Sequence, residues 1–224
     1  MRVRNRAVSL AYKVIVTVVS LAGLLMLFGF PRRALSFTTM RYYTTLSNVV
    51  CFVFFAAAAV HMAAQIRRYG PRGSSTLAPR VKGAVTIGIT VTLFVYQFML
   101  AKTPFSMNGG VSGDFFVHLL TPALVILDWA LFDEKGRLGW LDPLFWTILP
   151  LSYVVYAMIA APLGVKYYTG GRYPYFFMDV DVLGAGGVAL YVGGITVGFV
   201  ALSYVVVGLD RLLGRVGKSG AGKL

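Results

Sequence analysis

The chain has 224 residues, of which 58% are hydrophobic and only 13% are charged, and its mean hydropathy is +0.74. This charged fraction is about half that of a soluble domain, so a soluble enzyme is excluded and an integral membrane protein is expected. The net charge of +13 does not indicate a nucleic-acid partner. The basic residues gather at the ends of apolar stretches and do not line one polar face.

Six apolar stretches are each long enough to cross a bilayer as an α-helix. They cover about residues 8–30, 44–66, 83–102, 114–132, 143–163 and 182–209. Roughly 20 helical residues cross the hydrocarbon core, and the stretches lack the alternating period of barrel strands. The sequence therefore predicts an all-α polytopic fold. A six-helix transmembrane bundle over residues 1–210 precedes a basic cytoplasmic tail over residues 211–224, of which residues 214–224 are expected to be disordered.

The distribution of Lys and Arg predicts the orientation of these helices. If the amino terminus is cytoplasmic, fourteen basic residues lie on the cytoplasmic side: Arg2, Arg4, Arg6, Arg67, Arg68, Arg72, Arg80, Lys82, Lys135, Arg137, Arg211, Arg215, Lys218 and Lys223. Six lie on the outer side: Arg32, Arg33, Arg41, Lys102, Lys166 and Arg172. The positive-inside rule then predicts a multi-pass cell-membrane protein with both termini in the cytoplasm. The first apolar stretch is too long for the hydrophobic region of a signal peptide, so we expect it to be retained.

The second stretch concentrates hydrogen-bonding side chains at its outer end. Thr44, Ser47, Asn48 and Cys51 follow the spacing i, i+3, i+4, i+7 and therefore share one helix face. Thr45 lies beside this face. Buried polar side chains in a membrane face one another or a cavity, because lipid leaves them without partners. We expect a polar pocket here. Since Cys51 is the single cysteine, an intrachain disulfide is excluded.

The fourth stretch carries a second polar stripe, formed by His118, Thr121 and Asp128. His118 lies about four residues, or about 6 Å, inside the outer end, at a depth where it can meet Thr44. Asp128 lies about 15 Å deeper than His118, too far to orient its imidazole. Depth alone favours Asp179, at the outer approach to the sixth stretch, as the orienting carboxylate. Ser112 and Asp114 are candidate caps of the fourth helix, formed by the same stretch.

A deeper polar layer is expected from Lys13, His61 and Asp128, which lie about five or six residues from the inner ends of their helices. Charged groups inside a membrane pair with each other or line a wet path, so the sequence predicts an ion pair between Lys13 and Asp128. The alternative is that Lys13 extends its ammonium to the cytoplasmic interface.

Thr44 and His118 are the minimum for nucleophilic catalysis. A threonine hydroxyl reacts only when a base takes its proton, and histidine is the usual base. Asn48, Ser47 or a tyrosine hydroxyl such as that of Tyr175 could donate to an oxyanion. No cofactor is expected. A metal site is not expected either, because the chain has two histidines and they belong to different layers.

Three segments also carry a resemblance to known families: "RYYTTLSNVVCFVFF", "HLLTPALVILDWALFD" and "YPYFFMDV". In this order they resemble the bacterial Pr6Pr family of small membrane proteins over about residues 40–181. They are more distantly similar to the androgen-induced-gene family of animal transmembrane hydrolases. The latter resemblance implies threonine hydrolases of fatty acid esters, with Thr44 as nucleophile, Thr45 as the alternative, and His118 as base. Pro122 departs from the animal pattern, because it follows His118 by four residues instead of five.

Three functions therefore remain open from the sequence. The first is an intramembrane hydrolase of a lipid-like ester that enters from the outer leaflet, with membrane lipids as its surroundings and no nucleic acid as partner. The second is a transporter, channel or binding protein for a small solute or lipid, with Lys13, His61 and Asp128 as an ion or proton path. The third is a structural subunit whose polar residues join helices. The sequence carries no signal for an oligomeric state.

Overall fold

The computed structural model of the chain describes residues 3–31, 35–102, 112–167 and 170–221, with side chains described as far as Val216. Within these residues the secondary structure is helical, and six spans are long and apolar enough to cross a membrane. The prediction of an all-α polytopic membrane protein is confirmed.

Three of the six spans are composed of more than one element. The first two spans are the single helices α1 (Arg6–Leu27) and α2 (Tyr43–Tyr69), which follow each other through the short 3₁₀ turn η1 (Thr38–Arg41). The third span joins α3 (Pro79–Val95) to the π-helical turn η2 (Tyr96–Leu100). The fourth joins α4 (Gly113–Phe115), the π-helical turn η3 (Phe116–Leu120) and α5 (Thr121–Phe132). The fifth joins α6 (Asp142–Trp146) to α7 (Ile148–Ala160), and the 3₁₀ turn η4 (Phe176–Met178) leads to the sixth, α8 (Val180–Ala221).

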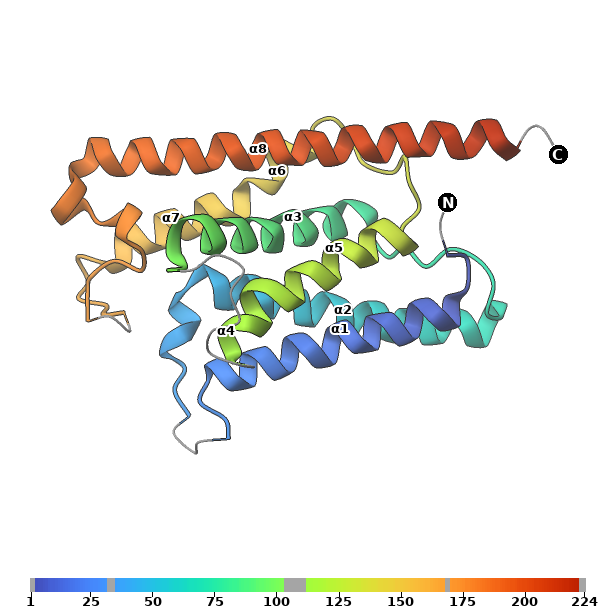
Figure 1. Cartoon of the computed structure of the whole chain (residues 1–224), viewed down its shortest axis with the longest axis horizontal. Helices are drawn as coiled ribbons and strands as arrows, with labels where there is room; N and C mark the ends of the chain where they lie inside the picture. The colour runs from blue at the N-terminus through green and yellow to red at the C-terminus, as the bar shows by residue number, and fades with distance from the viewer. Residues whose placement is uncertain (1–2, 32–34, 103–111, 168–169, 222–224) are drawn as a thin grey trace.

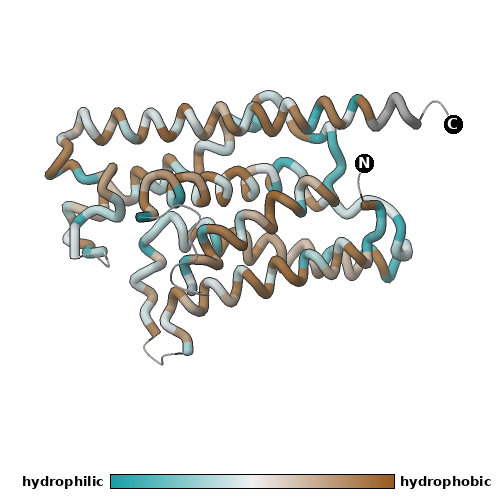
Figure 2. The backbone as a smooth tube through the Cα atoms, in the orientation of Figure 1, coloured by the Kyte–Doolittle hydropathy of each residue, from teal (hydrophilic) through white to brown (hydrophobic). Residues whose placement is uncertain are grey.

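The helices lie roughly along one long axis in three layers (Figure 1). The hairpin of α1 and α2 forms one outer layer, α3 and α5 lie in the middle with α7 at the level of α3, and α8 runs along the opposite side next to α6. Hydrophobic residues colour the middle of most helices, and hydrophilic residues gather in the connections (Figure 2). Between α1, α2, α3 and α5 the core contains Val16, Cys51, Phe55, Ile89 and Val125.

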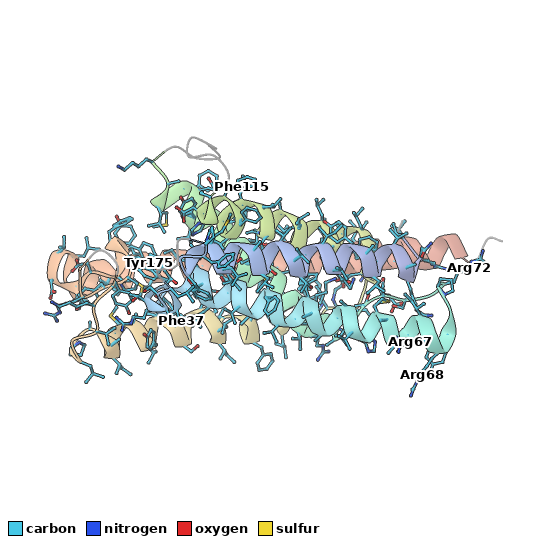
Figure 3. The ribbon with its side chains drawn as sticks, turned by 90° about the horizontal axis from the view of Figure 1, so that it is seen from below. Phe37, Arg67, Arg68, Arg72, Phe115 and Tyr175 are labelled. Carbon is cyan, nitrogen blue, oxygen red and sulfur yellow. The ribbon has the colours of Figure 1, made fainter. Side chains whose placement is uncertain are left out.

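The two ends of the bundle differ. The segments that lead to both chain termini lie at one end, which we call the termini end (Figure 1). Arg67, Arg68 and Arg72 lie there too, whereas Phe37 and Tyr175 lie toward the opposite end (Figure 3). We call that opposite end the Thr44 end, because α2 begins there. An even number of spans places both termini on one side.

Both π-helical turns lie near the Thr44 end, and the sequence explains one of them. At the end of η3 the amide of Thr121 donates to the carbonyl of Phe116, five residues earlier. The next residue is Pro122, which has no N–H to donate. The carbonyl of Val117 is therefore left without a helical donor. Such π turns widen a helix locally and often lie at functional sites.

Close helix contacts fix the position of this widened segment. A Cβ atom on Gly23 of α1 would lie 2.8 Å from the Cβ of Phe116 and 3.0 Å from a methyl group of Val117. Only glycine allows the backbones of α1 and η3 to approach this closely. Ser112 accepts from the amide of Phe115 at 3.4 Å as N-cap, as the sequence predicted.

Helix α8 differs from the expected helix and tail. It bends at Gly184, whose φ of 66° favours glycine, and it continues as one helix through Ala221. The prediction of a disordered tail from residue 214 is therefore wrong for residues 214–221. The side chain of buried Asp210 accepts from the amides of Arg137 at 2.8 Å and Leu138 at 3.0 Å, and so fixes this end of α8 to the α5–α6 connection.

Candidate active site

Thr44 and His118 are in contact. The Oγ1 atom of Thr44, in the first turn of α2, lies 3.3 Å from Nε2 of His118 in η3. His118 is only 7% exposed. The neighbouring Thr45 is buried as well, but it is the hydroxyl of Thr44 that reaches the imidazole. The sequence had left the choice between these two threonines open, and Thr44 is the one in contact with His118.

The other ring nitrogen of His118 is oriented by its own helix. Its Nδ1 lies 3.2 Å from the backbone carbonyl oxygen of Asp114, and the Asp114 carboxylate is 3.6 Å away. A carbonyl oxygen can only accept a hydrogen bond, so this contact assigns the proton to Nδ1. The lone pair of Nε2 then faces the hydroxyl of Thr44. This is the arrangement that a general base requires.

Asp179 does not take the role that depth suggested for it. Its Oδ1 accepts from the amides of Asp181 at 3.0 Å and Val182 at 3.2 Å, so the carboxylate caps the start of α8. The prediction that Asp179 orients His118 was wrong, because a carboxylate beside a helix start is satisfied by the free amides there. The i, i+4 spacing of Asp114 and His118 was the signal for the actual neighbour.

The ring of His118 is also held from the side. The Tyr96 ring of η2 stacks on the imidazole with a centroid distance of 3.6 Å and an angle of 12° between the planes. The two π-helical turns therefore meet at His118. This stacking leaves the imidazole one plane in which to lie, so that Nε2 stays directed at Thr44.

Asn48 joins α2, which carries Thr44, to η3, which carries His118. Its Nδ2 donates to the carbonyl of Thr44 at 2.8 Å and to the carbonyl of Val117 at 3.2 Å. The second acceptor is the carbonyl that Pro122 leaves without a helical donor. Both donors of the Asn48 amide are thus in use, and it is not the free oxyanion donor that the sequence suggested. Its role in the structure is positioning.

Ser47 is likewise engaged in helix contacts. Its hydroxyl lies 3.0 Å from the carbonyl of Thr44 and 2.9 Å from the hydroxyl of Thr92 on α3. These bonds tie the first turn of α2 to α3, and they leave Ser47 poorly placed to donate to an oxyanion.

Tyr175 is the remaining donor next to Thr44. The amide of Thr44 belongs to the first turn of α2, where amides lack helical acceptors, and it donates a long hydrogen bond, of 3.5 Å, to the Tyr175 hydroxyl oxygen. Burial raises the pKa of Tyr175 above its ordinary value, so the phenol keeps its proton at neutral pH. The Thr44 amide and the Tyr175 hydroxyl are two donors that can face a developing negative charge.

Two fully buried polar atoms near His118 have no hydrogen-bond partner in the described part of the chain: Oγ1 of Thr121 and Oδ1 of Asn48. Thr121 lies three residues deeper than His118, where the sequence placed it. Buried polar atoms are rarely left without partners, and where they occur beside a base they mark a place for a polar group or a water.

An apolar pocket begins at Thr44, and His118 is not among the residues that line it. It contains about 730 Å³ of space, part of it open to the surroundings, and lies between α3, η2, α7, η4 and α8. Thr44, Tyr96 and Tyr175 contribute the polar atoms of its Thr44 end, while Val91, Ile195 and Phe199 are among its apolar lining. Thr44 therefore stands between a base on one side and an apolar compartment on the other.

The second polar layer, toward the termini end, is a cluster of four buried charges. Nζ of Lys13 lies 3.2 Å from Oδ1 of Asp128 and 2.8 Å from the hydroxyl of Ser9. The predicted ion pair is confirmed. The other oxygen of Asp128 pairs with Lys82, whose ammonium also lies 2.6 Å from Asp133. All four charged side chains are nearly inaccessible.

The sequence analysis did not predict Lys82 and Asp133 as members of this cluster, and it wrongly included His61. Lys82 counted as an orienting charge of the connection, but it lies in the first turn of α3 and points into the bundle. Burial raises the pKa of Asp133, against the opposing effect of Lys82. His61 is only half-buried and, among the described residues, makes no ion pair or hydrogen bond, so it is not part of the layer. The signal for Lys82 was its position directly before an apolar run.

These observations define a class: an all-α polytopic membrane protein with a Thr–His pair beside an apolar pocket. Comparisons with protein-family models, curated proteins and solved structures found no match for this chain.

Proposed function

We propose that this protein is an intramembrane hydrolase of lipid-like esters, with Thr44 as nucleophile and His118 as general base. The observation that carries the proposal is the position of the Thr44 hydroxyl. It lies 3.3 Å from Nε2 of His118, whose Nδ1 faces a carbonyl oxygen, and it also lines an apolar pocket. A reactive hydroxyl between a base and an apolar compartment suits a substrate with a long apolar part and one ester group.

The proposed reaction has the two steps that other hydroxyl nucleophiles use, acylation of Thr44 and then hydrolysis of the acyl-threonine. The Thr44 oxygen attacks the ester carbonyl carbon while its proton passes to Nε2 of His118. The tetrahedral intermediate collapses, the bond to the alcohol oxygen breaks, and His118 returns the proton to that oxygen. Water then attacks the acyl-threonine, with its proton taken by His118. The second tetrahedral intermediate collapses, its bond to the Thr44 oxygen breaks, and His118 returns the proton to that oxygen. The carboxylic acid then leaves, and the Thr44 hydroxyl is restored.

The negative charge of the intermediate needs donors that are already in place. The backbone amide of Thr44 and the hydroxyl of Tyr175 converge within 3.5 Å of each other, and the amino terminus of α2 adds the positive end of the helix dipole. A carbonyl oxygen of the substrate placed beside both groups would replace the Tyr175 oxygen as acceptor of the Thr44 amide and would also accept from the Tyr175 hydroxyl. Asn48 supports this geometry by joining α2 to η3.

The membrane orientation is part of the proposal. The basic residues gather at the termini end, where Figure 3 shows Arg67, Arg68 and Arg72. We infer that this end faces the cytoplasm and that the Thr44 end faces the outside. The substrate then enters from the outer leaflet.

Ester hydrolysis by the detergent-purified protein tests the proposal. Fluorogenic acyl esters should be cleaved by the wild type and by Thr45→Ala, whereas Thr44→Ala and His118→Ala should lose at least about 10³-fold in kcat/KM. Circular dichroism should show all four proteins folded. An inert wild type, or equal activity in Thr44→Ala, would remove the proposal.

A lipid-binding or transport protein is the second candidate, favoured by the same apolar pocket. The buried charges give less support to an ion path, because Lys13, Lys82, Asp128 and Asp133 compensate one another. The apolar core around Val16, Phe55 and Val125 also lies next to them. Flux into vesicles that is lost in Asp128→Asn, without ester cleavage, would favour transport. An obligate partner subunit recovered with the protein would favour the structural reading.

A further inference from the structure

The pocket has a measurable depth below the nucleophile. Tyr96 stacks on the base that Thr44 contacts, and the hydroxyls of Ser47 and Thr92 are 2.9 Å apart, so the levels of α2 and α3 can be matched. Thr44 lies at the level of Tyr96. The deepest lining residue of α3 is Val91, which comes five residues before Tyr96 and therefore lies deeper in the bundle. At a rise of about 1.5 Å per residue, the pocket extends about 7.5 Å below Thr44.

Phe199 closes the bottom of the pocket from α8. Its side chain is 3% exposed and packs in the core cluster that contains Ile87, with Val91 packed against that cluster. Ile87 lies one helical turn below Val91. The ring of Phe199 therefore stands between the space beside Thr44 and the interior of the bundle.

The walls between Thr44 and Phe199 are mostly apolar. The threonines that line this part have hydroxyls already bonded: Thr92 to Ser47, Thr147 to the carbonyl of Leu144 at 2.6 Å, and Thr196 to the carbonyl of Val192 at 2.7 Å. The remaining lining is aliphatic or aromatic. Of the buried polar side-chain atoms of this lining, the Tyr43 hydroxyl lacks a hydrogen-bond partner among the described residues. The rest of the wall is apolar or already bonded, so a saturated hydrocarbon chain fits most of it.

The direction of proton transfer decides which part of an ester occupies the pocket. His118 must return its proton to the leaving alcohol oxygen, so the alcohol lies toward His118. His118 is not among the pocket residues. The acyl chain, on the other side of the carbonyl carbon, then points into the pocket.

We propose that this pocket measures the length of the acyl chain, with Phe199 as the specificity-determining residue, and that it selects chains of about six carbons. Bonds between carbons are about 1.5 Å long and advance about 1.3 Å each in a zigzag, so about six carbons fill the 7.5 Å below Thr44. Longer chains meet Phe199 and must leave the pocket sideways. This inference rests on the proposed hydrolase function and names its substrate class.

Chain-length profiles test the inference. The wild type should cleave hexanoyl esters at least about tenfold faster, in kcat/KM, than decanoyl or palmitoyl esters of the same alcohol. Phe199→Ala opens the pocket by about one helical turn toward Ile87, or about 6 Å, and should move the optimum to decanoyl esters. Val91→Phe fills the bottom of the pocket and should move the optimum to butyryl esters. Phe145→Ala is the matched control, because Phe145 is 63% exposed and lies outside the pocket.

A binding measurement separates this inference from the hydrolase proposal. Free fatty acids of the same lengths should displace a fluorescent fatty-acid analogue from Thr44→Ala in the same order of chain length. Displacement in this order by a protein that cleaves no ester would remove the hydrolase proposal but keep the inference that the pocket selects chains by length. If the wild type is active and its chain-length profile is unchanged in both Phe199→Ala and Val91→Phe, selection of chain length by this pocket is overturned. The hydrolase proposal is then unaffected. If Phe199→Ala does not fold, the Val91→Phe shift decides alone.

Discussion

Two polar regions of one bundle use their buried groups in different ways. At the termini end, four charges from α1, α3 and the end of α5 meet as two lysines and two aspartates, and each is paired. At the Thr44 end, a histidine contacts one hydroxyl, two neighbouring polar atoms have no partner, and an apolar pocket begins beside them. The first arrangement satisfies its own members and joins helices. The second leaves hydrogen-bonding capacity for a group from outside.

The completeness of pairing separates a structural from a functional polar layer in this membrane protein. Charge alone would have pointed to the termini end, because charged residues inside a membrane are usually functional. The completeness of the pairing argues for stability there. At the Thr44 end, incomplete pairing, two π-helical turns that meet at His118 and contact with a pocket argue for function. Substitutions at the two ends should therefore affect different quantities.

The largest expected effect on stability is that of Asp128→Asn. This change leaves Lys13 without its acidic partner and Lys82 with one in place of two, and breaking a buried ion pair costs about 3–5 kcal/mol. The free energy of unfolding, measured by titration with a denaturing detergent and circular dichroism, should fall by this amount.

The control for this prediction is Asp181→Asn, whose carboxylate is 55% exposed and lies 3.5 Å from Arg172. It should change the free energy of unfolding by less than about 1 kcal/mol, as exposed pairs do. A loss below about 1 kcal/mol in Asp128→Asn would contradict the view that the charge cluster joins the helices.

Tyr175→Phe comes second and should affect activity instead of stability. It removes one of the two donors proposed for the oxyanion, which typically lowers kcat by about 10²-fold. The ratio of kcat between wild type and variant on one ester measures this effect. Tyr191→Phe, on α8 and outside the pocket, is the matched control and should retain full activity. Equal kcat in wild type and Tyr175→Phe would remove Tyr175 from the oxyanion site.

The smallest expected effect is that of Asp114→Asn. The carboxylate is 61% exposed and 3.6 Å from Nδ1 of His118, so its charge is screened by its surroundings. The backbone carbonyl that orients the ring, at 3.2 Å, is unchanged by this substitution. We expect kcat/KM to fall by less than about tenfold. A loss as large as that of His118→Ala would show that the carboxylate, and not the carbonyl, orients the base.

The sequence was sufficient for the six spans and for two of the contacts. Apolar length predicted each span to within a few residues, except at the end of α8, because hydrophobicity over about 20 residues is a strong signal. Helix periodicity and depth predicted the contact of Thr44 with His118 and the pair of Lys13 with Asp128. Both rely only on the rise of a helix and on the need to pair polar groups.

The remaining features depend on tertiary structure. The pairing of Lys82 with Asp128 and Asp133 requires the side-by-side position of α3 and α5, which periodicity does not give. The free carbonyl of Val117 follows from the π turn before Pro122, and a regular helix had been assumed there. The pocket lies between helices far apart in the sequence, α3, α7 and α8. None of these follows from one helix considered alone.

The central claim, that Thr44 is a nucleophile activated by His118, is tested most directly by covalent labelling with a fluorophosphonate, followed by mass spectrometry of the peptides. We predict one adduct on the peptide that contains Thr44 in the wild type and in Thr45→Ala, and none in Thr44→Ala or His118→Ala. A wild type that hydrolyses esters while the adduct lies on another residue, or that remains unlabelled while folded, would contradict the account.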